Sequence, residues 1–107
     1  MTQIEFNDSI IKTLDRIREL FTRKNMEYKT EDPLANFTTG GRLLRPGLNL
    51  EPAQYEALKA YLAKHVAQVY NQPITEDTRE NWSDIAVYSL IALAMLDVSH
   101  GRYAANA

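Results

Sequence analysis

Residues 75–96, TEDTRENWSDIAVYSLIALAML, are the stretch around which the rest of the chain is organised. From Ile85 to Val98 almost every position is apolar, and a helix that is apolar on all sides is normally buried. One stripe of this helix, drawn at about 100° per residue, is acidic in its first half and apolar in its second. The stripe consists of Asp77, Glu80, Asp84, Tyr88, Ile91 and Met95. The sequence therefore predicts a buried helix with two acids, Glu80 and Asp84, at the mouth of a core.

The acidic end of this helix is the leading candidate for a functional site. A carboxylate beside a core is costly unless it meets a cation, a metal or hydrogen-bond donors. The alternative is a solvated first turn whose negative charge suits the helix dipole.

Composition limits the class of protein. A chain of 107 residues with 45% hydrophobic and 24% charged residues is typical of one soluble globular domain, here residues 1–107. The absence of cysteine excludes disulfides and thiolate metal sites, and two histidines are few for a zinc centre, so only a hard cation held by oxygens remains open.

Location and partners follow from the same composition. No stretch reaches the roughly 20 apolar residues of a membrane span, and the N-terminus lacks the basic flank of a signal peptide, so we expect a cytoplasmic protein without a membrane partner. A net charge of −2 with mixed signs does not predict the positively charged surface that binds duplex nucleic acid. A free nucleotide could still bind through a few local cations.

The first helix is predicted near residues 9–28, with a start nearer Gln3 as the alternative. Asn7, Asp8 and Ser9 offer N-cap oxygens, and one apolar stripe follows them at Ile10, Leu14, Ile17 and Phe21. The same wheel places Lys24, Asn25 and Tyr28 on or beside the inward stripe. These polar residues either line a cavity or mark where the helix emerges from the core, with the Lys24 stem packed on the surface.

The segment after this helix is predicted to be mostly irregular. Asp32 and Pro33 have the form of an N-cap and first helical position, so Leu34 to Phe37 should form a short helical turn in which Asn36 is a cap or a ligand contact. Thr38 to Pro46, TTGGRLLRP, is either a mobile surface loop or a backbone cradle for phosphate.

Two further helices complete an all-α fold. A stripe from Tyr55 to Val69 predicts a helix near 52–70, and it contains His65, whose hydrogen-bond partner could be Asp84 or Tyr88. The organising helix spans about 76–99. Three main helices and a short turn cannot cover so apolar a helix, so we expect a second subunit to complete this small bundle.

Two motifs carry a family resemblance. KNMEYKTEDPLANF and ENWSDIAVYSLIALAML resemble small phage and prophage proteins of the nucleotide-modification-associated type, which are related to the MazG-like all-α NTP pyrophosphatases. The matching positions are Lys24, Asn25, Tyr28, Asp32, Pro33, Asn36, Phe37, Glu80, Asp84, Ala86 and Tyr88. The middle helix, YLAKHVAQVYN, is only loosely similar to that of the family, and the inward faces lack the first of the two carboxylate pairs of MazG-like metal sites.

The resemblance implies a nucleotide-binding protein and, as an expectation, a Mg²⁺-dependent nucleoside triphosphate pyrophosphohydrolase or a nucleotide-modification accessory. Glu80 and Asp84 would bind Mg²⁺, a cation that prefers carboxylates with retained water. Lys24 would complete the catalytic set by meeting phosphate. The residues expected to contact substrate are Asn25, Tyr28, Asp32, Asn36, Lys64 and Tyr88. The alternative is a non-catalytic oligomeric helical module whose polar cluster is structural.

Overall fold

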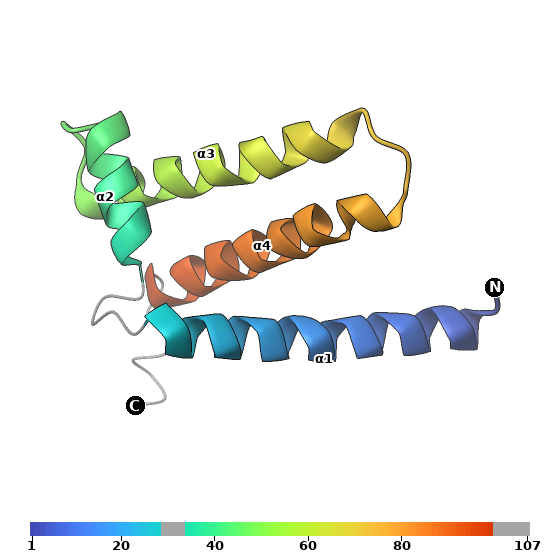
Figure 1. Cartoon of the computed structure of the whole chain (residues 1–107). Helices are drawn as coiled ribbons and strands as arrows, with labels where there is room; N and C mark the ends of the chain where they lie inside the picture. Colours follow the sequence, from blue (N-terminus) through green and yellow to red (C-terminus); the bar gives the residue numbers. More distant parts are fainter. Residues whose placement is uncertain (29–33, 100–107) are drawn as a thin grey trace. The chain divides into compact units, whose positions relative to one another are not determined.

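A computed structural model of the chain describes the backbone of residues 1–28 and 34–99 and the side chains of residues 1–23 and 34–97. Over these ranges the protein consists of α-helices and one short 3₁₀ helix, with no strand (Figure 1). The elements are α1 (Gln3–Tyr28), α2 (Ala35–Leu44), α3 (Leu50–Tyr70), η1 (Glu76–Thr78) and α4 (Arg79–Ser99). The predicted all-α class is confirmed. None of the helices in the described part is long and apolar enough to cross a membrane.

The chain divides into two compact units, Met1–Pro33 and Leu34–Ala107. Each unit is described by itself, and the sequence-based expectation of one domain stays a prediction. The first unit contains α1 and the second contains the other helices.

Helix α1 begins at Gln3, which is the alternative start and lies six residues before the start near residue 9. Thr2 Oγ1 accepts a hydrogen bond from the backbone N–H of Glu5 at 3.1 Å, and the Glu5 carboxylate accepts one from the N–H of Thr2 at 3.0 Å. This reciprocal pair is a capping box, which satisfies two N–H groups that have no partner inside the helix. The predicted caps at Asn7, Asp8 and Ser9 are therefore wrong, because all three lie inside the helix.

Helix α2 is the largest departure from the sequence-based prediction. The helical turn predicted from Leu34 to Phe37 is present as the start of a longer helix, and the irregular loop predicted from Thr38 is wrong, since residues 35–44 form one continuous helix that includes Gly40 and Gly41. A Cβ built on Gly41 would lie 2.2 Å from the carbonyl oxygen of Ala53 on α3. The glycine is therefore a site of close helix approach, and its N–H does not belong to a loop that could cradle phosphate.

Helices α3 and α4 form an antiparallel hairpin joined through η1, and α2 crosses one end of α3 (Figure 1). The core of this unit consists of Phe37, Ala57 and Leu58. The half-buried apolar side chains that pack against it are Leu34, Tyr88, Ile91, Ala92 and Met95. Gln54 is buried as well, and its amide donates to Thr38 Oγ1 at 2.9 Å, which ties α3 to α2.

Candidate functional site

A polar cluster lies between α3 and α4, where the sequence places the acidic half of the organising helix. His65 on α3 is bonded through Nδ1 to Asn81 Oδ1 at 2.9 Å. The carboxylate of Asp84, one turn further along α4 than Asn81, lies 3.8 Å from the same nitrogen. An amide oxygen only accepts, so this arrangement requires the proton on Nδ1. His65 thus connects the two helices of the hairpin through one short hydrogen bond and one longer electrostatic contact.

Aromatic rings continue the cluster toward the core. The His65 ring lies 5.5 Å from that of Tyr88, and Tyr88 stacks on Tyr61 with the centroids 6.4 Å apart. Phe37 meets both tyrosines edge to face at 5.8 and 6.3 Å. Such pairs contribute roughly 0.5–1.5 kcal/mol each beyond burial of their area. The cluster is therefore polar at the Asn81 end and continuous with the apolar core at the Phe37 end.

The environment of Tyr88 disfavours its ionised form. Partial burial raises the pKa of the Tyr88 hydroxyl above its ordinary value, and the negative charge of Asp84 raises it further, followed by a smaller contribution from Tyr61. The phenol is therefore neutral and can donate a hydrogen bond across the physiological pH range.

The two acids proposed as metal ligands occupy different environments. Glu80 lies exposed in the first turn of α4, whereas the side chain of Asp84 is 22% exposed and faces His65. Their spacing of four residues leaves them on one side of the helix, about 40° apart around its axis. Within the described part of the chain, no group of three or more histidine, aspartate and glutamate side chains is placed to hold a metal ion.

The other predicted site residues fall into two groups. The side chains of Lys24, Asn25, Tyr28 and Asp32 lie outside the described residues. Asn36 on α2 and Lys64 on α3 are exposed. Their roles toward a substrate stay predictions. Of the predicted residues, the structure brings Asp84 and Tyr88 together around His65.

Sequence reasoning missed two members of the cluster. Asn81 is the closest polar partner of His65, and Tyr61 supplies the ring that stacks on Tyr88. Both signals were present as spacing. Asn81 lies one helical turn before Asp84, and Tyr61 lies one helical turn before His65. The anticipated partners of His65, Asp84 and Tyr88, are both in contact with it.

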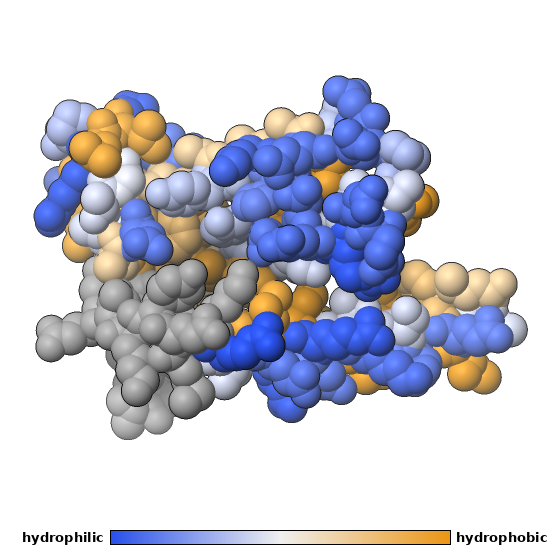
Figure 2. Space-filling model, in the orientation of Figure 1, coloured by the Kyte–Doolittle hydropathy of each residue, from blue (hydrophilic) through white to orange (hydrophobic). Residues whose placement is uncertain are grey.

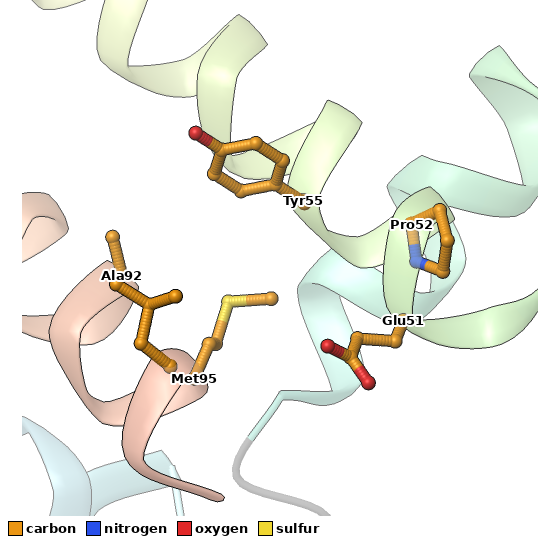
Figure 3. A pocket seen from close by; sticks show the side chains of 6 residues that line it. Glu51, Pro52, Tyr55, Ala92 and Met95 are labelled. Atoms are coloured by element: carbon orange, nitrogen blue, oxygen red, sulfur yellow. The ribbon is translucent and has the colours of Figure 1, made fainter. Parts of the chain in front are cut away.

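A separate pocket of about 490 Å³ lies between the start of α3 and the end of α4. Met95 reaches from α4 toward α3, with the Tyr55 ring and the Glu51 carboxylate near its end (Figure 3). The lining is mostly apolar, and its charged member is an acid. Such a lining disfavours a polyphosphate, because the carboxylate would repel it and no lining cation would neutralise it.

No family model, curated protein or solved structure matches the chain.

Proposed function

We propose that this chain is a cytoplasmic, non-catalytic helical module that works by self-association, with its polar cluster holding the α3–α4 hairpin together. The observation that carries the proposal is an apolar surface on α4 that remains exposed within the unit Leu34–Ala107. The outer face consists of the exposed residues Trp82, Ser89 and Leu93, the half-buried Ala86, and Leu96, which is exposed and also lines the pocket between α3 and α4; Leu90 lies beside them. They lie roughly 130° around the helix from the inner residues that pack on α2 and α3.

The exposure of this face is large for so short a chain. Trp82, Leu93 and Leu96 are 52%, 57% and 52% exposed. Full burial of such side chains contributes on the order of 2 kcal/mol each, so a half-exposed leucine still offers about 1 kcal/mol to a partner. Contiguous exposed apolar surface of this kind marks interaction sites in soluble proteins.

Other helices of the chain also carry exposed apolar side chains. Figure 2 shows hydrophobic surface at the end of α2, where Leu43 and Leu44 are 79% and 54% exposed. Helix α1 exposes further residues of its apolar stripe: Ile10, Leu14 and Phe21. Association through apolar surface would cover side chains that each unit by itself leaves exposed.

The direct test of self-association is the mass in solution. Light scattering on the purified chain at micromolar concentration should give at least twice the 12.2 kDa of one chain. A particle of 12.2 kDa across the accessible concentration range would refute the proposal.

A second function, Mg²⁺-dependent binding or pyrophosphohydrolysis of a nucleotide of the kind handled by phage MazG-like proteins, is supported by one observation. Asp84 is a half-buried carboxylate whose nearby cationic group is a histidine that carries charge only when protonated, and Glu80 lies one turn away. A hard divalent cation would stabilise that pair of acids and could bind the phosphates of a nucleotide.

The variant Asp84→Asn distinguishes metal-nucleotide binding by Asp84 from a structural role of Asp84 in the α3–α4 hairpin. If a Mg²⁺-nucleotide binds through Asp84, the variant loses that binding in calorimetry while its melting temperature changes little. Asp77→Asn, on the exposed η1, is the control and should alter neither quantity. A wild-type chain that binds no nucleotide in Mg²⁺ or Mn²⁺, or a variant that binds unchanged, would exclude the metal site; a variant that unfolds would assign Asp84 to the fold.

A further inference from the structure

The outer face of α4 has the spacing of a helix-pairing seam. Its residues Trp82, Ala86, Ser89, Leu93 and Leu96 follow one another at intervals of four, three, four and three. This alternation averages 3.5 residues and keeps side chains in line along a helix that packs against another helix. A second helix laid along this face would contact all five positions.

The seam is complementary to itself when the two helices run in opposite directions. Trp82 and Leu96 lie seven residues on either side of Ser89, while Ala86 and Leu93 lie three and four residues from it. A two-fold axis at Ser89 therefore sets Trp82 against Leu96 of a second copy and Ala86 against Leu93 of that copy. The small Ala86 then leaves room for Leu93 of the second copy, and Trp82 packs against another large apolar side chain, Leu96 of that copy.

The residue at the centre can be buried without leaving an unsatisfied polar group. Ser89 Oγ donates to the carbonyl oxygen of Ile85 in the preceding turn, at 2.9 Å. Its hydroxyl is thus already bonded within the helix, and its small size permits close approach of the two backbones.

Charges beside the seam favour the same direction. Arg79 and Asp97 are 18 residues apart, which is five helical turns, so they lie on one line along the same edge of the seam. An antiparallel pair brings Arg79 near Asp97 of the second copy at both ends. A parallel pair would leave Arg79 and Asp97 at opposite ends of the seam, where the two side chains cannot pair. Arg79 binds Glu76 and Asp97 also has an interaction within its own chain, so the pair at the rim sets direction more than affinity.

Building on the proposed self-association, we propose that α4 pairs antiparallel with α4 of a second copy about a two-fold axis at Ser89. The occupant of the outer face is a second copy because the face matches itself in spacing, side-chain size and charge.

The absence of cysteine from the chain makes single-cysteine crosslinking a direct test. Ser89→Cys should form a disulfide-linked dimer under mild oxidation, because the two sulfurs meet at the axis. Trp82→Cys alone should not, since its copies would lie about 21 Å apart at 1.5 Å per residue, far beyond the roughly 4.4–6.8 Å between Cα atoms of a disulfide. A mixture of Trp82→Cys and Leu96→Cys should give the mixed dimer.

The outcomes distinguish this arrangement from self-association itself. Ser83→Cys, on α4 but off the seam, is the control and should crosslink no more than a random surface thiol. A chain that scatters as a dimer while Ser89→Cys behaves like this control would overturn the antiparallel pair and leave self-association standing. Self-crosslinking of Trp82→Cys would show a parallel pair and overturn it too. A monomeric wild type would overturn both self-association and the antiparallel pair. The outer face of α4 would then be available to another helix of the same chain.

Discussion

Tyr88 joins the polar and aromatic parts of the candidate site. Its ring contacts His65 on one side and Phe37 and Tyr61 on the other. Because burial and the charge of Asp84 raise the pKa of its hydroxyl, the folded chain keeps this proton at a pH where the unfolded chain has lost it. The stability of the hairpin therefore falls at alkaline pH as Tyr88 loses its proton.

The sign of this coupling is fixed by the direction of the shift. The contribution of protonated Tyr88 to the stability of the folded chain is fully present below the pKa of tyrosine in the unfolded chain, near 10. It is lost as the pH rises through the higher pKa of Tyr88 in the folded chain. Urea unfolding at pH 8 and pH 11 should show a smaller loss of stability for Tyr88→Phe than for the wild type. Tyr70→Phe, at a tyrosine that is 80% exposed, should keep the wild-type loss. Equal losses in all three proteins would contradict this account.

His65 shows how far the site could be predicted from the sequence. Its place in an apolar stripe indicated a hydrogen-bonded core histidine, and the acidic helix supplied Asp84 and Tyr88 as partners. The actual bond to Asn81 depends on the register between α3 and α4. Register is set by packing across the hairpin, which the periodicity of either helix alone does not contain.

At the scale of elements, α2 owes its position to two glycines. Gly41 is buried against the backbone of Ala53, and a Cβ on Gly40 would lie 3.3 Å from both the Cβ of Ala57 and the hydroxyl oxygen of Tyr61. The sequence favours a loop at the paired glycines because glycine permits backbone angles that other residues rarely adopt, and within a helix glycine costs about 1 kcal/mol relative to alanine. Close packing against α3 outweighs that cost, and no local sequence signal distinguishes the two uses of glycine.

Gly41→Ala tests this packing. The new methyl group would overlap the Ala53 carbonyl, which is backbone and cannot move aside as a flexible side chain would. We expect a loss of about 1–3 kcal/mol in the free energy of unfolding, measured by chemical denaturation. Gly47→Ala, where a Cβ would meet nothing within 4 Å, is the matched control and should be neutral or slightly stabilising. A Gly41→Ala protein as stable as this control would contradict the close approach.

The boundaries of α3 and α4 were predictable, whereas the exposure of α4 was not. The apolar residues around Ile85 to Leu96 indicated a helix buried on all sides, and in the structure its inner face packs on the core while Leu90 and Leu93 stay exposed. Helical periodicity reports which residues are apolar but not what covers them.

At the scale of the whole molecule, the central claim is that a second copy covers the outer face of α4. Trp82 is the only tryptophan of the chain and lies on that face. Its fluorescence therefore reports directly on whether the face is covered. Leu93→Asp places a charge in the middle of the face, where burial without a partner is costly, so it should keep the fold but prevent association. Ile74→Asp, at a side chain that is 96% exposed and lies outside α4, is the matched control.

The decisive measurement is acrylamide quenching of Trp82 at micromolar protein concentration. The wild type and Ile74→Asp should be quenched weakly and emit at shorter wavelength, as a covered indole does. Leu93→Asp should be quenched several-fold more strongly, with emission shifted toward that of an indole in water. A wild-type tryptophan that is quenched as readily as that of Leu93→Asp would contradict the claim.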